Sequence, residues 1–419
     1  MRVRSRSARP LRPFRPLRPV AVAVASGAAA VALCLAAPSA AVWADDGHDH
    51  GGPLTVTTIL SGSSLSHTFT TASSSTPQTE ALSRPDDITH LGDDLFVGFQ
   101  NGVGAQGEAS GSGNLDSTVV EFSTSGQPIA QWDIAGKDDG LTADPDLHAV
   151  IATVNEDGNS SLYTITPGGG SVQHYAYNEA LPHFGGTDAI SILGEQILIS
   201  ASAPGTTNGA TLPQPYPAVY SVLLDRATSV ATVTPVFGDT DPAVVANVGS
   251  QHGQTVTLGL TDPDSSEIVP FDAPRFGGAF MLDGQGDQQQ IFVHQHWGSA
   301  PTLSVLNLTQ SVDDTAWPNE DGTLFATDST NNTVDAVTGG FPDRPVVAVT
   351  PCGSNMAPST CPAPPTFPAN YLGTVNPWTG EVDPLTTTGV AIVPQGGLLF
   401  VPSDLGDHGS EGGEGGDGG

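Results

Sequence analysis

Four aspartates stand at the head of apolar runs that recur along the sequence. They are Asp87, Asp139, Asp188 and Asp314, with 52 positions between the first two and 49 between the second and the third. Hard divalent cations prefer clustered carboxylate oxygens. If the fold brings these side chains together, they repel one another unless a cation or a shared proton relieves them. We therefore expect an aspartate ring that binds a divalent cation, with calcium as the first choice.

Further polar residues follow the second strand of several repeats, in loops that return to the same rim as the aspartates. This predicted ligand-binding rim comprises Asn101, Gln106, Glu108, Asn155, Glu156, His294 and His296. His183 precedes Asp188 by five positions and is a candidate general base, although a lone loop histidine is more often structural. The acidic segment 262–267 (DPDSSE) is interpreted as a solvated turn.

The elements that must position these residues are pairs of short apolar strands. The best-defined pair lies within 84–107, where Asp86 and Asp87 precede an alternating run, an acidic turn and a second run. Similar pairs span 138–155, 187–200 and 313–328, and weaker ones span 276–294 and 389–401. Repeats of about 40 to 50 residues made of short strands are typical of β-propeller blades. The sequence predicts an all-β, six-bladed β-propeller, with seven blades as the alternative because 371–385 forms a further hairpin.

The last repeat, 389–402, has only two predicted strands, so its outer strands must come from elsewhere. The alternating segment 54–70 is the best source, and its pairing with the last repeat would close the ring and leave no long exposed edge. We divide the chain into a secretory signal peptide (1–44), a leader with the ring-closing strands (45–83), the β-propeller (84–403) and a disordered acidic Gly-rich tail (404–419).

The N-terminal segment and the composition indicate an exported, acidic protein. Seven arginines among the first 18 residues precede an Ala- and Val-rich run, which is typical of a signal peptide. Without that segment, five basic residues face 44 acidic ones, a formal charge of 5 − 44 = −39, and nucleic acid is excluded as a partner. No later stretch reaches about 18 consecutive apolar residues, so no membrane span is expected. The closely spaced Cys352 and Cys361 are predicted to form a disulfide.

Two segments, 318–334 (PNEDGTLFATDSTNNTV) and 376–382 (NPWTGEV), resemble secreted bacterial β-propellers of the NHL-repeat and gluconolactonase-like superfamily. The resemblance covers roughly 84–403 and is specific for the architecture. It implies a divalent ion at the mouth of the central channel, because the lactonases of that superfamily hold one there with a glutamate, two asparagines and an aspartate. This sequence has four aspartates at the channel-mouth positions instead.

The segment Gly102 to Gly107 fits a dinucleotide-binding fingerprint but leads into a Ser- and Gly-rich stretch rather than a helix. It is therefore interpreted as a loop, and no nucleotide cofactor is expected. The function that follows is an exported propeller that binds a divalent metal or a small ligand at the mouth of its channel. A metal-dependent, lactonase- or esterase-like hydrolase is one alternative, and a scaffold that binds a protein or cell-wall polymer is another.

Overall fold

The computed structural model describes residues 53–182, 186–202, 215–294, 301–351 and 370–403. Throughout these residues the chain is built from β-strands, with two short 3-10 turns, η1 (Gly62–Ser64) and η3 (Gln285–Asp287). None of the described helical segments is long and apolar enough to cross a membrane. The predicted signal peptide, the acidic tail, His183, His296 and the two cysteines of the predicted disulfide lie outside the described residues.

Within the described residues, the paired strands include six antiparallel sets of four, and four of these sets follow the chain order. The first is β4 (Pro85–Leu91), β5 (Asp94–Phe99), β6 (Asp116–Ser123) and β7 (Pro128–Ala135). The second is β8 (Asp138–Asp144), β9 (Ala149–Val154), β10 (Ser161–Ile165) and β11 (Val172–Tyr177). The third is β12 (Ile190–Leu193), β13 (Gln196–Ser200), β14 (Pro217–Asp225) and β15 (Val230–Gly238). The fourth is β18 (Pro263–Ile268), β19 (Phe280–Gly284), β20 (Gln289–His294) and β21 (Thr302–Asn307).

The remaining two sets exchange strands along the chain. One contains β22 (Val312–Ala316), β25 (Val346–Val349), β26 (Tyr371–Val375) and β27 (Val382–Pro384). The other contains β29 (Leu398–Pro402), β23 (Gly322–Asp328), β24 (Thr333–Thr338) and β1 (Leu54–Ser61). The sheet of the second set therefore combines strands from both ends of the described chain.

This exchange corrects two expected strand pairs. The segment 313–328 was expected to pair with itself, but β22 pairs with β25 and β23 pairs with β29. Each of these two strands belongs to a different sheet, so the chain leaves one set after β22 and returns to it at β25. The expected pair 389–401 is also wrong, because β28 (Thr387–Gly389) runs parallel to β1 at one edge of this sheet and β29 pairs with β23 at the opposite edge.

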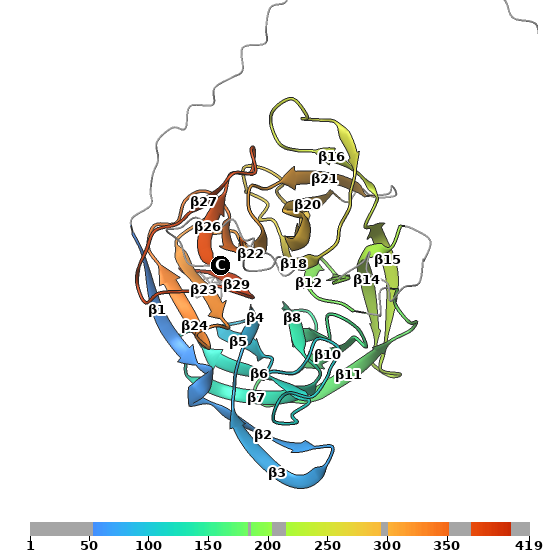
Figure 1. Ribbon diagram of the computed structural model, residues 1–419, viewed down its shortest axis with the longest axis vertical. Coiled ribbons are helices and arrows are strands. Elements are labelled where there is room, and N and C mark those ends of the chain that lie inside the picture. The colour runs from blue at the N-terminus through green and yellow to red at the C-terminus, as the bar shows by residue number, and fades with distance from the viewer. Residues whose placement is uncertain (1–52, 183–185, 203–214, 295–300, 352–369, 404–419) are drawn as a thin grey trace, which may run out of the picture. The chain divides into compact units, whose positions relative to one another are not determined.

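The segment 54–70 is divided between two sheets. Only β1 pairs with the last set, through β24, whereas β2 (Ser66–Thr71) forms a separate hairpin with β3 (Ser74–Ala81) that projects from the first set (Figure 1). A second protruding hairpin comprises β16 (Pro242–Val245) and β17 (Thr255–Thr257), and its strand β16 runs parallel to β21.

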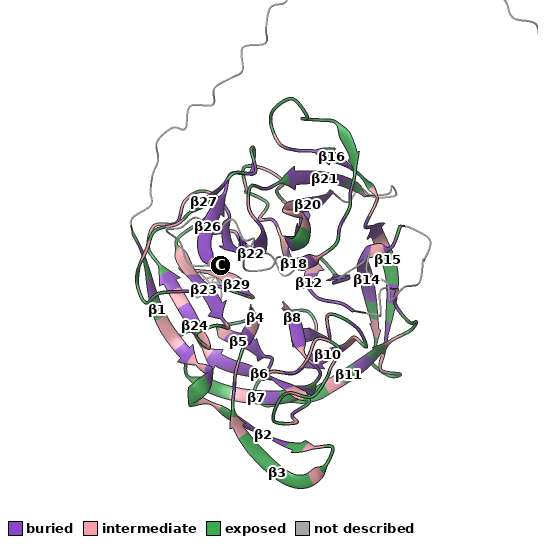
Figure 2. Cartoon of the chain, viewed as in Figure 1, coloured by how far each residue is buried: buried purple, intermediate pink, exposed green. Residues whose placement is uncertain are grey.

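The inner strands β4, β8, β12, β18, β22 and β29 surround the centre of the described unit (Figure 1). Buried residues concentrate on the inner and middle strands, and exposed ones on the outer strands and hairpins (Figure 2). Apolar side chains fill the space between neighbouring sets, as where Phe96 and Val119 of the first set meet Leu141 and Val150 of the second. This packing holds the inner strands, and hence the residues that face the centre, in fixed positions.

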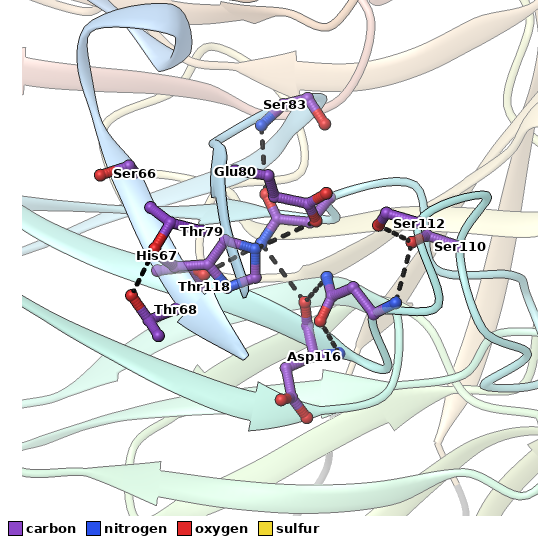
Figure 3. Close-up of polar contacts among 12 residues, drawn as sticks. Ser66, His67, Thr68, Thr79, Glu80, Ser83, Ser110, Ser112, Asp116 and Thr118 are labelled. Carbon is purple, nitrogen blue, oxygen red and sulfur yellow. Dashed lines mark hydrogen bonds and ion pairs between the residues drawn. The ribbon is translucent and has the colours of Figure 1, made fainter. Parts of the chain in front are cut away.

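His67 fastens the β2–β3 hairpin to the first set. Its ring is 2% exposed and stacks on Phe69 with 5.3 Å between the ring centroids. Nε2 lies 3.2 Å from the Glu80 carboxylate on β3 (Figure 3). Nδ1 lies 3.3 Å from the Asp133 carboxylate on β7. Burial lowers the pKa of His67, but hydrogen bonds and charge attraction from Asp133 and Glu80 outweigh it, so the net pKa is raised.

Candidate functional site

A cavity of about 1090 Å³ opens at the centre, between the inner strands. Its lining includes residues of β4, β8, β12, β18, β22 and β29. The described lining contains one lysine, Lys137, and one arginine, Arg84. It contains nine carboxylates, namely Asp86, Asp87, Asp139, Glu156, Asp188, Asp264, Glu267, Asp313 and Asp314. The cavity is therefore strongly acidic.

All four aspartates of the predicted ring line this cavity, and two of them, Asp87 and Asp314, accept hydrogen bonds from backbone N–H groups. The Asp87 carboxylate accepts hydrogen bonds from the next backbone N–H at 2.7 Å and from the Leu141 N–H of β8 at 2.6 Å. Asp314 repeats the arrangement, with the next N–H at 2.7 Å and the Leu398 N–H of β29 at 2.5 Å. Burial raises the pKa of Asp87 to about 8 and that of Asp314 to about 7. Each carboxylate thus ties one inner strand to the next.

Asp139 takes part in a buried ion-pair network. Its Oδ1 lies 2.6 Å from Lys137 Nζ, which also contacts the Glu156 carboxylate. The Gln100 side-chain amide donates to Asp139 at 3.2 Å, and so does the Glu156 backbone N–H. Burial raises the pKa of Asp139 to about 7 although Lys137 opposes the shift. Burial lowers the pKa of Lys137, but the attraction of Asp139 and Glu156 outweighs it and holds the pKa well above its usual value.

Asp188 and Asp86 differ from these residues because neither side chain makes a hydrogen bond or an ion pair with any described residue. The Asp188 residue is only 5% exposed, and both carboxylates line the cavity. Burial, followed by repulsion from Asp139, raises the pKa of Asp188 well above its usual value. Burial also raises the pKa of Asp86 well above its usual value, against the attraction of Lys137. These two carboxylates therefore face the cavity without a hydrogen-bond partner among the described residues.

Asp264 and Asp313 form a bonded carboxyl pair on another part of the cavity wall. The Gln285 side-chain amide donates to Asp264 at 2.8 Å and also contacts the Asp313 carboxylate. The Gly396 N–H donates to the other oxygen of Asp313 at 2.6 Å. Burial and the charge of Asp313 raise the pKa of Asp264 well above its usual value, as expected for two neighbouring carboxyl groups that share a proton.

The acidic segment 262–267 was interpreted as a solvated turn, and this interpretation is wrong. Its residues from Pro263 onward form β18, an inner strand that places Asp264 and Glu267 at the cavity. The apolar pattern does not predict this strand, because the strand contains few apolar residues. Its position beside a polar cavity explains this composition. Pairs of adjacent acidic residues also indicate the cavity wall. Asp86 and Asp313, which directly precede Asp87 and Asp314, line the cavity beside them.

The predicted rim is only partly gathered here. Of its described members, Glu156 lines the cavity. Asn101 and Asn155 both have positive φ, and their side chains bond local backbone: the Ser83 N–H donates to Asn101 at 3.1 Å, and the Lys137 N–H donates to Asn155 at 2.9 Å. They shape the turns that follow the second strands. The remaining described members, which the cavity lining does not include, are Gln106, Glu108 and His294.

Carboxylate oxygens are suitable donors for calcium, but their arrangement does not fit an ion. Among the described residues, no three His, Cys, Asp or Glu side chains converge closely enough to hold a metal ion. Asp87 and Asp314 are also committed to backbone N–H groups. The aspartate ring around a calcium ion therefore stays a prediction.

The sequence matches no protein-family model and no curated protein. Its structural neighbours include gluconolactonase-like proteins and other β-propellers, as the sequence resemblance led us to expect. One is the periplasmic gluconolactonase of Pseudomonas aeruginosa, with 13% identity and a TM-score of 0.38 over 83% of this chain and 98% of that chain. Another is a functionally unknown protein from Desulfotomaculum acetoxidans, with 11% identity and a TM-score of 0.40 over 84% and 100%. A third is hydrazine synthase of Kuenenia stuttgartiensis, with 13% identity and a TM-score of 0.35 over 70% of this chain and 66% of that chain.

Proposed function

We propose that this protein is an exported, six-bladed β-propeller that binds a small molecule in its central cavity. The six antiparallel sets of four strands supply the blades, and the pairing of β1 with β24, in the sheet of β29, supplies the closure. The predicted signal peptide supports export. The observation that carries the proposal is the cavity itself, whose lining includes two carboxylates, Asp188 and Asp86, that have no partner within the described residues.

The size of the cavity favours a small organic molecule over a single ion. Ligand cavities typically measure about 300 to 1,000 Å³, and the volume here, about 1090 Å³, lies just above that range. The predicted divalent ion at Asp87, Asp139, Asp188 and Asp314 is the second candidate, because all four line the same cavity. The hydrolase and scaffold alternatives stay predictions of the sequence.

The test is ligand-observed saturation-transfer NMR on the mature chain, residues 45–419. The probes are butane-1,4-diamine, butane-1,4-diol, succinate and glucose, and calcium chloride is measured separately by calorimetry. The variant Ala143→Trp places a bulky ring where a small residue lines the cavity. Its matched control, Ala227→Trp, places the same ring in an exposed turn after β14.

We expect at least one probe to bind the wild-type chain and Ala227→Trp, and to lose its signal in Ala143→Trp. Binding that persists in Ala143→Trp would move the site away from the cavity. If no probe binds the wild-type chain, the proposed function is contradicted.

A further inference from the structure

The geometry points to a ligand that carries an ammonium group, with Asp188 and Asp86 as the side chains that accept it. This inference rests on the proposed function and names the chemical class of its ligand. It does not require the four aspartates of the predicted ring to bind a metal ion together. Two of them, Asp87 and Asp314, accept hydrogen bonds from backbone N–H groups.

The first step is to ask which carboxylates in the cavity are free to accept new hydrogen bonds. Asp87 and Asp314 each accept two backbone N–H groups, and Asp139 is engaged by Lys137 and Gln100. Asp264 and Asp313 are bonded through Gln285 and to each other. Glu156 contacts Lys137, and Glu267 accepts a hydrogen bond from the Ile268 backbone N–H. The Asp188 and Asp86 side chains are left without such partners among the described residues.

The second step concerns burial. Asp188 is 5% exposed, so most of its residue surface is withdrawn from water. A buried polar group without a hydrogen-bond partner is destabilising, and more so when it is charged. A donor brought by a ligand would supply the missing bonds, and its binding would recover part of that cost. An unpartnered carboxylate in the wall of the cavity therefore favours a ligand that carries hydrogen-bond donors.

The third step concerns the sign of the charge. Asp188 is repelled by Asp139, Glu156 and Asp86, and Lys137 is the opposing cation. The Lys137 ammonium is already shared between two of these carboxylates. The remaining excess of negative charge favours a cation and disfavours an anion.

The fourth step selects an ammonium group from among the cations. An ammonium group offers three N–H donors, which suit carboxylate oxygens. Calcium needs six to eight oxygens, whereas no group of three metal-binding side chains occurs among the described residues. An aliphatic amine can also use the apolar part of the lining, to which Ile190 and Leu141 contribute.

The experiment is isothermal titration calorimetry with butane-1,4-diamine and its uncharged counterpart of the same length, butane-1,4-diol. We expect the wild-type chain to bind the diamine and to bind the diol at least about tenfold more weakly. Asp188→Asn and Asp86→Asn should each weaken diamine binding at least about tenfold, because each removes one charge-assisted hydrogen bond. Asp225→Asn, in an exposed turn, should leave it unchanged.

Melting temperatures show whether each variant is folded, and Asp86→Asn carries the test if Asp188→Asn does not fold. Wild-type affinity for the diamine in both folded variants would overturn the inference, and so would a wild-type chain that does not bind the diamine. If the diol, succinate or glucose binds in an Ala143-dependent way while the diamine does not, the inference fails and the proposed function stands. Calcium binding that requires Asp188, without diamine binding, also overturns it.

Discussion

Replacing Lys137 with methionine tests the electrostatics of the cavity most severely. Its Nζ is 2.6 Å from Asp139, it also contacts Glu156, and its side chain is only 14% exposed. The variant Lys137→Met therefore leaves the Asp139 and Glu156 carboxylates without their cation at a largely buried position. Removing one partner of a buried ion pair destabilises a protein by about 3 to 5 kcal/mol. We expect the free energy of unfolding at pH 8 to fall by about that amount.

The assay is urea unfolding followed by tryptophan fluorescence, with two further variants. Lys137→Met/Asp139→Asn removes the more buried of the two stranded carboxylates, so it should recover at least about 2 kcal/mol of the loss. Arg226→Met removes an exposed cation and should change stability by less than about 0.5 kcal/mol. The reasoning is refuted if Lys137→Met is no less stable than the wild type, or if the double variant is less stable than the single one.

Lys137 also permits an independent check, because it is the only lysine in the sequence. Selective labelling with ¹⁵N-lysine gives one side-chain signal, which reports the protonation state of this amine directly. Because Asp139 and Glu156 raise its pKa, the signal should keep the protonated form beyond about pH 10.4, the usual lysine pKa. A signal that titrates below that value would contradict the ion-pair network.

Three further predictions concern stability. The pKa of His67 is raised in the folded state, so the stabilising effect of its protonation is complete below about pH 6.5 and is lost as the pH rises through the folded-state pKa. His67→Asn should therefore lower the free energy of unfolding more at pH 5.5 than at pH 9. An equal loss at both pH values would contradict this. Gly98→Ala should cost about 1 to 3 kcal/mol in urea unfolding, because a Cβ there would lie 1.5 Å from a buried carboxylate oxygen of β8, whereas Gly111→Ala meets no atom within 4 Å and should be neutral. Truncating the mature chain through Ser61 removes β1 with its three buried apolar side chains, so the melting temperature should fall by many degrees. Removal of 404–419 should leave the melting temperature unchanged. Equal effects of the two truncations would refute the pairing of the two ends.

Local strand pairs could be predicted from the sequence, and distant pairings could not. The pairs β4–β5, β8–β9, β12–β13 and β19–β20 lie where alternating apolar runs flank short turns. In those hairpins the turn and the apolar pattern together fix the partner. Long stretches of chain separate β22 from its partner β25, and β23 from β29, one of its two partners, and nothing in the local pattern identifies these partners.

The acidic character of the site could also be predicted, but not the state of each carboxylate. Equivalent positions in the repeats indicated that the four leading aspartates share one region, and all four line the cavity. Whether a carboxylate accepts a backbone N–H, as Asp87 does, or lacks a partner among the described residues, as Asp188 does, depends on contacts between different sets of strands. Those contacts follow from tertiary packing, which the apolar pattern of a single segment does not specify.

The central claim is that the cavity holds an ammonium-bearing ligand at Asp188. The most direct measurement is a crystal structure of the mature chain grown with butane-1,4-diamine. We predict electron density for the diamine inside the cavity, with one nitrogen about 2.7 to 2.9 Å from a carboxylate oxygen of Asp188 or Asp86, as charge-assisted hydrogen bonds require. Density for the diamine only at the outer surface, or an ordered diamine whose nitrogens contact neither carboxylate, would contradict the claim.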